Sequence, residues 1–210
     1  MDFKTFFSEQ ARKPSGLFGR LVMSIIFDRG NIAVNTLMMD ALEIRGKDRI
    51  LEIGFGTGKF MKKIAKRLDT GCIEGIDFSS TMVEMAKRRN RKNIEEGRVR
   101  IQQGDFEKEA YDDGCFDAVC SANTIYFWPR PDDVVSKIFR IIKPGGRAVL
   151  TFEDINQLEE RSLDADVFNL YSTRDIEDLL RRNGFSGEID VITEERKSLK
   201  FQCVVAIKKT

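Results

Sequence analysis

The stretch of sequence that decides the fold is Leu51-Glu52-Ile53-Gly54-Phe55-Gly56-Thr57-Gly58-Lys59-Phe60. It continues a β-rich run that begins at Arg49, and it places three glycines at alternate positions directly after that run. Glycine has no Cβ, so the backbone can turn sharply there and come close to a ligand. From residue 58 to residue 68 apolar side chains then recur at helical spacing. The stretch therefore predicts a strand, a glycine turn that faces a ligand, and a helix.

Short β-rich runs alternate with helical patterns along the rest of the chain, and this alternation predicts parallel βαβ units with helices on both faces of one sheet. The last two runs are separated only by residues 194–198, too few for a crossover, so we expect them to pair as an antiparallel hairpin. A capping box at Ser172 and Asp175 begins a helix that stops at Gly184. The expected strands are 49–54, 72–78, 99–104, 116–122, 147–152, 188–193 and 199–207, with a helix at 132–142 and a turn at 143–146 before the fifth strand.

The residues before Ile44 have a helical pattern and are expected to pack over the top of the sheet. Gly16 and Gly19 would allow this region to hinge as a lid. We therefore divide the chain into an N-terminal helical cap at 1–45 and an α/β domain at 46–210, within one structural domain. A chain of 210 residues suits that size.

Composition excludes several classes of function. The apolar share of 41% and the charged share of 33% are those of a globular protein. The net charge of +1 predicts no global attraction to nucleic acid or to an anionic membrane. No apolar run approaches the roughly 20 residues that span a bilayer, and the charged first 16 residues do not resemble a signal peptide. We expect a cytoplasmic protein without stable membrane insertion, present as a monomer or a homodimer.

The sequence also offers no metal site, because the four cysteines show no ligand spacing and histidine is absent. Any general base must therefore be Asp, Glu, Tyr, Lys or Cys. The basic run at 87–92 ends a predicted helix, where cations are favoured by the helix dipole, and we interpret it as a solvated face and not as a nucleic-acid site. Phe3, Phe6 and Phe7 are interpreted as core or lid contacts, since no basic cluster accompanies them.

The spacing of the glycines separates three nucleotide motifs. A Walker A loop needs four residues between its glycines, but three lie between Gly54 and Gly58, and Phe60 stands where the hydroxyl residue should be. A dinucleotide fingerprint would place its third glycine or alanine at Lys59. Neither motif fits.

The pattern E-x-G-x-G-x-G resembles motif I of the class I S-adenosylmethionine-dependent methyltransferases, and the resemblance extends over residues 48–152. It implies S-adenosylmethionine as the cofactor and S-adenosylhomocysteine as the product. In that family the residue at Asp77 holds the ribose hydroxyls, Asp105 accepts from the adenine amine, Phe106 lines the ring, and Glu52 orders the glycine loop near the methionine amino group. The residues implied in cofactor binding are Glu52, Gly54, Phe55, Gly56, Thr57, Gly58, Asp77, Phe78, Met82, Gly104, Asp105, Phe106, Ala122 and Asn123.

Ligands of an open α/β sheet bind beyond the carboxyl ends of its strands, so the segment 123–129 after the fourth strand is the best local candidate for the acceptor site. Asn123 could donate or accept a hydrogen bond, and Tyr126 could orient an acceptor or take a proton. In the alternative, the aromatic residues of this segment fill core beneath the next helix. Residues 153–171 could also border the pocket. The candidates for lining the acceptor pocket are Phe18, Met23, Phe27, Tyr126 and Trp128.

The leading hypothesis is therefore a methyltransferase that transfers a methyl group to a small-molecule acceptor by in-line displacement. Compact size without a recognition domain favours a small acceptor. Two rivals stay open: a non-catalytic module that binds S-adenosylmethionine, and an NAD(P)-dependent oxidoreductase, which the glycine spacing disfavours.

Overall fold

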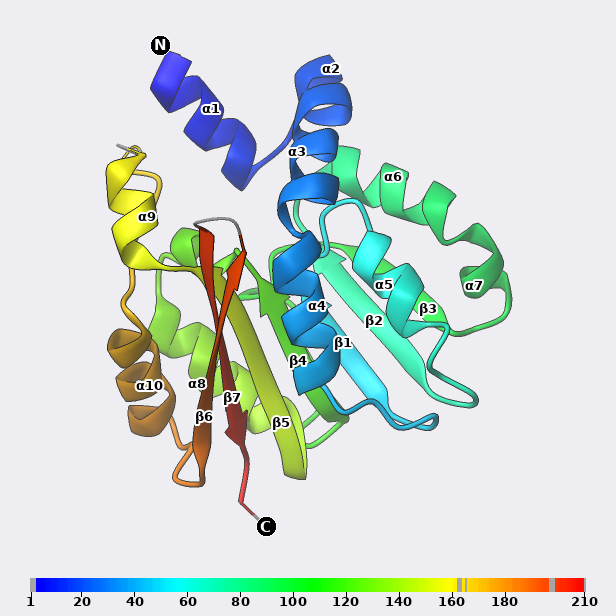
Figure 1. Ribbon diagram of the computed structural model, residues 1–210. Coiled ribbons are helices and arrows are strands. Elements are labelled where there is room, and N and C mark those ends of the chain that lie inside the picture. Colours follow the sequence, from blue (N-terminus) through cyan, green and yellow to red (C-terminus); the bar gives the residue numbers. More distant parts are fainter. Residues whose placement is uncertain (1–2, 162–163, 165, 197–198, 210) are drawn as a thin grey trace.

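The computed structural model describes residues 3–161, 164, 166–196 and 199–209 (Figure 1). Its centre is a seven-stranded sheet in the order β3-β2-β1-β4-β5-β7-β6. Strands β3 to β5 pair in parallel, whereas β7 pairs antiparallel with both β5 and β6. The predicted mostly parallel sheet with a reversed terminal strand is thus confirmed. The strands are β1 (Arg49–Ile53), β2 (Cys72–Asp77), β3 (Val99–Gln103), β4 (Phe116–Ala122), β5 (Ile142–Glu153), β6 (Ile189–Arg196) and β7 (Leu199–Ile207).

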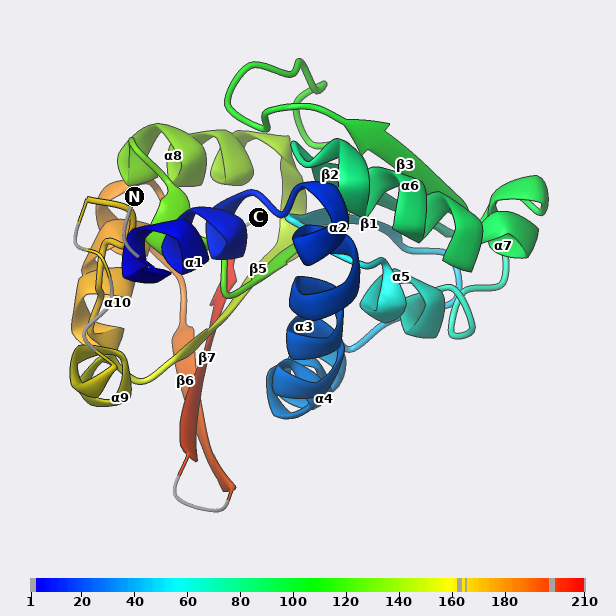
Figure 2. The same cartoon turned by 90° about the horizontal axis from the view of Figure 1, so that it is seen from above.

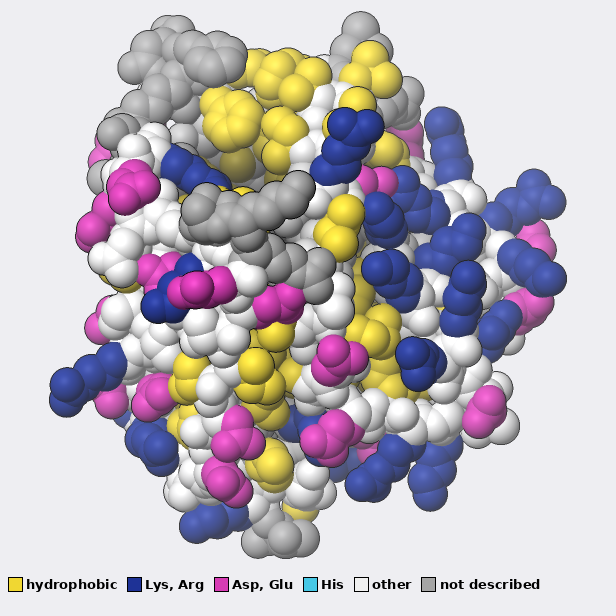
Figure 3. All heavy atoms as spheres, in the orientation of Figure 1, with side chains coloured by type: hydrophobic (Ala, Val, Ile, Leu, Met, Phe, Trp, Pro, Cys, Tyr) yellow, Lys and Arg dark blue, Asp and Glu magenta, His cyan; other side chains and the backbone are white. Residues whose placement is uncertain are grey.

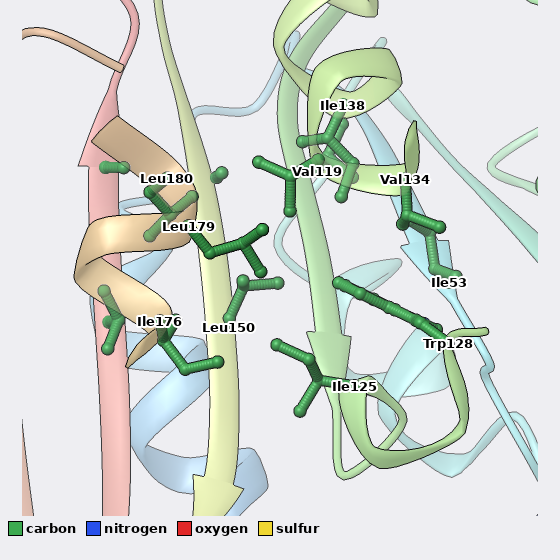
Figure 4. Close-up of a cluster of buried hydrophobic side chains, with 14 of the residues drawn as sticks. Ile53, Val119, Ile125, Trp128, Val134, Ile138, Leu150, Ile176, Leu179 and Leu180 are labelled. Atoms are coloured by element: carbon green, nitrogen blue, oxygen red, sulfur yellow. The ribbon is translucent and has the colours of Figure 1, made fainter. Parts of the chain in front are cut away.

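Helices cover both faces of this sheet because the central strands are apolar on both sides. In β1, Leu51 and Ile53 belong to the core beneath α8 and α10, part of which Figure 4 shows, whereas Ile50 belongs to the core beneath α4, α5 and α6. The helices of the α/β region are α5 (Lys59–Ile64), α6 (Ser80–Arg89), α7 (Arg91–Glu95), the 3-10 turn η2 (Ile125–Phe127), α8 (Pro131–Ile141), α9 (Ile155–Glu160) and α10 (Thr173–Arg182).

The N-terminal region divides differently from the prediction. Its elements are α1 (Phe3–Arg12), α2 (Gly16–Phe18), the π-helix η1 (Gly19–Met23), α3 (Ser24–Gly30) and α4 (Ile32–Ala41). Helix α4 buries Val34, Leu37 and Met38 in the core that it shares with β1, β4, β5 and β7. It is therefore part of the sheet's helical layer, and a cap that ends at residue 45 is too long. Only α1, α2, η1 and α3 lie at the edge where β1, β2 and β4 end (Figures 1 and 2).

Two local predictions need correction, and one is confirmed. Strand β5 begins at Ile142 and not at residue 147, because Ile142 pairs with Phe116 before a bulge in which Gly145 has a φ of +78°. The hairpin connection is shorter than expected, since β6 extends to Arg196, which pairs with Leu199; residues 197–198 lie outside the described residues. The capping box of α10 is present as predicted.

Candidate active site

A cavity of about 650 Å³ lies along the edge of the sheet where β3, β2, β1, β4 and β5 end and the antiparallel β7 begins. Neighbouring strands are about 4.8 Å apart, so six strand ends extend over roughly 24 Å. Residues of α1 and α3 line the opposite side of the cavity. The strand-end residues that line it are, in their order across the sheet, Gly104, Asp77, Gly54, Asn123, Glu153 and Leu199.

The glycine loop after β1 has the left-handed backbone that its sequence predicts. Gly54, Gly56 and Gly58 have φ values of +72°, +53° and +68°. Gly54 and Gly56 line the cavity, and at Gly54 a Cβ would collide with Thr124. Gly58 does not line the cavity; a Cβ there would lie 2.6 Å from the Cβ of Ala86 in α6. Gly58 thus permits close packing of α5 against α6. It was predicted to contact the ligand, but it lies outside the cavity lining.

Asp77 ties this loop to the end of β2. Its Oδ2 accepts a hydrogen bond from the N–H of Gly56 at 2.9 Å, and its Oδ1 accepts one from the N–H of Ser79 at 2.9 Å. The side chain is buried at the floor of the cavity. Burial raises the pKa of Asp77 to about 6, although both N–H groups act in the opposite direction. Asp77 therefore orders the loop in addition to the ligand contact that the sequence predicts.

Glu52 is the second buried carboxyl group at the cavity. Its Oε2 has no hydrogen-bond partner among the described residues, although the side chain lines the cavity. Burial and, to a smaller extent, the neighbouring Asp77 raise the pKa of Glu52 well above its ordinary range. A buried acceptor without a donor is costly, so this oxygen fits a ligand that brings a hydrogen-bond donor or a positive charge. The methionine amino group of the implied cofactor has both.

The remaining residues that the resemblance implies also surround this half of the cavity. Phe78, Met82 and Phe106 line it with apolar surface. Asp105 also lines it, and its Oδ1 accepts from the N–H of Glu107 at 3.1 Å. The predicted cofactor residues that border the cavity are Glu52, Gly54, Phe55, Gly56, Thr57, Asp77, Phe78, Met82, Gly104, Asp105, Phe106, Ala122 and Asn123.

A polar cluster joins α3 to the glycine loop and to α6. Asp28 receives two hydrogen bonds from Arg89, at 3.0 Å to Oδ1 and 2.8 Å to Oδ2, and the hydroxyl of Thr57 donates to Oδ1 at 2.5 Å. Lys59 Nζ donates to the backbone oxygen of Asp28 at 2.8 Å. These contacts, which we call the Asp28 clasp, were not predicted. They also correct the interpretation of the basic run at Arg89, whose side chain is bound to Asp28 of α3 rather than solvated.

Asn123 lies at the centre of the cavity, after β4, with a left-handed φ of +54° that asparagine tolerates better than most residues. Its Nδ2 donates to Asn31 Oδ1 at 3.0 Å. The hydroxyl of Tyr126 donates to Asn123 Oδ1 at 3.3 Å and accepts from the N–H of Glu153 at 2.7 Å. Burial raises the pKa of Tyr126 above its ordinary value of 10, so the hydroxyl is unsuited to take a proton near neutral pH. Its geometry instead orients Asn123.

The other half of the cavity has apolar walls from distant segments. In the segment after β4, Ile125 and Trp128 belong to the hydrophobic core (Figure 4), as the alternative interpretation expects. Trp128 also lines the cavity, so its place in an acceptor site stays a prediction. One ion pair, Glu153–Arg161 at 2.6 Å, interrupts the apolar surface. The apolar residues that line the cavity from the N-terminal helices, from the segment 155–171 and from β7 are Phe7, Met23, Ile26, Phe27, Leu158, Phe168, Leu199 and Phe201.

Phe18 does not line the cavity, contrary to the prediction. Its ring packs edge-on against Phe6 of α1 at a centroid distance of 5.1 Å, and Phe7 of the same helix borders the cavity. Asn31, Leu199 and Phe201 were not among the predicted pocket residues. The predicted hairpin could have indicated Leu199 and Phe201, because an antiparallel β7 must begin at the edge where the parallel strands end.

No group of three His, Cys, Asp or Glu side chains is arranged to hold a metal ion in the part of the chain that the structure describes. Within the same residues, each helix is too short or too polar to cross a bilayer.

Comparison with known proteins gives related sequences. Residues 51–150 match the family model for a methyltransferase domain. The chain is 32% identical over 133 residues to the uncharacterized methyltransferase YdaC of Bacillus subtilis, an alignment that covers 63% of this chain and 71% of YdaC. It is 34% identical over 103 residues to the ubiquinone/menaquinone biosynthesis C-methyltransferase UbiE of Geotalea daltonii, which covers 49% of this chain and 44% of UbiE.

The fold is also shared with a solved structure. Phosphoethanolamine N-methyltransferase 2 of Haemonchus contortus, in complex with phosphomonomethylethanolamine and S-adenosylhomocysteine, superposes with a TM-score of 0.79. The alignment covers 100% of this chain and 61% of that structure at 18% identity. At this identity the likeness concerns the fold. The chain spans less than half of UbiE and about three fifths of the Haemonchus protein.

The buried carboxyl of Glu52 leads to a test by stability. Because its pKa is raised in the folded state, the folded protein keeps a proton that the unfolded chain releases above its ordinary pKa of 4.5. The free energy of unfolding of the ligand-free protein therefore falls as pH rises above that value. Glu52→Gln removes this contribution, so the variant should be the more stable protein at about pH 8 by at least about 1 kcal/mol, and the difference should vanish near about pH 4.

Urea unfolding of both proteins across this pH range measures the difference. The exposed Glu188→Gln is the matched control and should follow the wild type at every pH. A Glu52→Gln variant that is less stable than the wild type throughout would show that the carboxylate has a partner in solution, and the assignment of an unsatisfied oxygen would then be wrong.

Proposed function

Because the chain belongs to the class I S-adenosylmethionine-dependent methyltransferases, we propose that it transfers the methyl group of this cofactor to a small, largely apolar acceptor. The observation that carries the proposal is a single cavity with two unlike halves. The half above β3, β2 and β1 contains buried carboxyl groups and the glycine loop. The half above β4, β5 and β7 is mostly apolar.

We assign the first half to the cofactor. Gly54 and Gly56 let the backbone approach it closely, Glu52 offers its unpaired oxygen to the amino group, and Asp77 offers its carboxylate to the ribose. S-adenosylmethionine supplies a methyl group that is already activated by the positively charged sulfur. The task of the protein is therefore to hold the acceptor atom in line with that methyl group. Proximity and orientation alone can greatly accelerate the transfer.

We assign the second half to the acceptor. Its walls are aromatic and aliphatic, and its few polar groups are concentrated at Asn31, Asn123 and the Glu153–Arg161 pair. Such a site suits an apolar molecule with one polar end. The name of UbiE, a relative of this chain, refers to quinone biosynthesis, which supports an apolar acceptor without identifying it.

Within this half we assign Asn123 to contact the reacting end of the acceptor. Tyr126 is a positioning residue, because its hydroxyl holds the Asn123 amide between β4 and the end of β5. Glu153 is a carboxylate that lines the acceptor half, and it could take a proton from an acceptor that must lose one. We also propose that α1, α2, η1 and α3 form a lid that the Asp28 clasp holds closed.

Cytoplasmic location remains part of the proposal. The support is that Cys72, Cys115, Cys120 and Cys203 are all free thiols, which is typical of a reducing compartment.

Binding and turnover separate the proposal from its rivals. Calorimetry should show tight binding of S-adenosylhomocysteine and no comparable binding of NAD⁺. A panel of small apolar acceptors incubated with radiolabelled cofactor should then reveal methyl transfer. Binding of S-adenosylhomocysteine without transfer to any member of a broad panel would favour a non-catalytic binding module, because a fold by itself does not determine a reaction.

The role of Asp77 can be tested by substitution. Asp77→Ala removes the carboxylate that we assign to the ribose and also the acceptor that orders the N–H of Gly56. Loss of charge-assisted hydrogen bonds should weaken binding of S-adenosylhomocysteine by at least about 1–2 kcal/mol in calorimetry. Asp190→Ala, at an exposed position of β6, is the control and should bind as the wild type does. An unchanged dissociation constant for Asp77→Ala would refute the ribose assignment.

Variants of Asn123 and Tyr126 test the acceptor half. Asn123→Ala and Tyr126→Phe should lower the rate of methyl transfer by about tenfold or more while leaving the affinity for S-adenosylhomocysteine nearly unchanged. Asn123→Gly is the matched variant, because glycine adopts the positive φ freely and removes only the side chain. A normal rate in Asn123→Gly would mean that the backbone and not the amide matters. Loss of cofactor affinity in all three variants would instead place these residues in the cofactor half.

A further inference from the structure

The outer surface of the lid exposes a row of large apolar side chains. Their exposed fractions lie between 39% and 61%. Four of them come from η1 and α3 at positions 21, 22, 25 and 26, which lie on one side of a helix, while Met23 and Ser24 between them are buried. Contiguous exposed apolar surface on a folded protein usually marks an interaction site. We call this row the lid stripe, and its members are Leu21, Val22, Ile25 and Ile26 of η1 and α3, together with Ile32 at the start of α4.

Basic side chains flank the lid stripe. Figure 3 shows Lys and Arg gathered over α5, α6 and α7, beside hydrophobic side chains on the lid. The Asp28 clasp holds α3 against this basic region, since Lys59 and Arg89 come from α5 and α6. Helix α5 contains three lysines and no acidic residue, and α6 ends in three consecutive basic residues. The net charge of +1 thus hides a strongly uneven distribution.

We propose that the lid stripe docks on the surface of an anionic lipid bilayer, with the basic residues of α5 and α6 facing the lipid headgroups. Apolar side chains on one face of a helix, together with neighbouring Lys and Arg, are the combination that binds reversibly in the interface of a membrane. The charge of the flank selects an anionic surface over a neutral one. The same combination disfavours a second copy of this chain, because pairing two lid stripes would bring two basic flanks together.

The position of the lid stripe relative to the cavity supports this occupant. Ile26 belongs to the stripe and also lines the cavity. An apolar molecule dissolved in a bilayer could therefore reach the cavity along the lid. Docking itself does not depend on the proposed reaction, and it can be measured without cofactor or acceptor.

Sedimentation of the full chain with lipid vesicles tests the proposal. The protein should sediment with vesicles of phosphatidylcholine mixed with phosphatidylglycerol, much less with phosphatidylcholine alone, and less as the salt concentration rises. Leu21→Ser combined with Ile25→Ser should lower the partition coefficient at least about tenfold. Lys62→Glu combined with Lys63→Glu should abolish the preference for anionic vesicles.

The terminal hairpin offers a matched control. Val191→Ser combined with Ile192→Ser removes two exposed apolar side chains, at 39% and 41%, from a different surface, and should leave vesicle binding unchanged. Affinity for S-adenosylhomocysteine should stay normal in the Leu21 and Ile25 double variant, because neither residue lines the cavity.

Three results would overturn the proposal. The first is that the wild type does not bind vesicles, and the second is that the lid-stripe and hairpin variants bind vesicles equally well. The third is that sedimentation velocity shows a dimer, and that the lid-stripe substitutions convert it to a monomer without changing lipid binding. The last result would identify the stripe as an interface between two copies of the chain.

Discussion

The site depends on one buried carboxylate. Asp77 joins two loops that are far apart in the sequence, because it accepts from Gly56 in the loop after β1 and from Ser79 at the start of α6. Without this acceptor, the N–H of Gly56, which has a positive φ, would need another hydrogen-bond partner. Burying the Asp77 carboxylate costs free energy, and its raised pKa reflects that cost. The fold tolerates that cost because the same carboxylate orders the loop and remains at the cavity surface, where a ligand can use it.

The order of the strands then divides the cavity. Strands β1 and β4 are neighbours in the sheet although about 60 residues separate them in the chain, so the glycine loop and Asn123 lie side by side. The reversal of β7 has a further consequence. An antiparallel strand begins where its parallel neighbours end, and Leu199 and Phe201 therefore join Glu153 at the cavity. The polar half and the apolar half thus follow from topology as much as from the motifs.

The parts of this structure that sequence could predict are those that local physics decides. The glycine run, the strand-end Asp77 and the capping box of α10 depend on neighbours within a few residues. The pocket residues that were missed come from contacts between distant segments. Asn31 reaches Asn123 across 92 positions, and no local pattern indicates that pair. The prediction that Phe18 lines the cavity was wrong for the same reason. The direction in which α1 folds back decides which side of the N-terminal region faces the cavity, and Phe18 packs against Phe6 of α1.

One short segment of the proposed lid, residues 28–31, contacts both halves of the cavity. Asp28 binds Thr57 and Arg89 on the cofactor side, and Asn31, three residues later, binds Asn123 on the acceptor side. A movement of α3 that breaks the clasp would therefore also release the Asn123 amide, since a helix transmits displacement along its length. Under the proposed assignment of the two halves, this segment links the cofactor side of the cavity to the acceptor side. The exposed residues of the lid stripe in η1 and α3 directly precede this segment, so the proposed docking surface and the contacts to the cavity lie on one continuous stretch of chain.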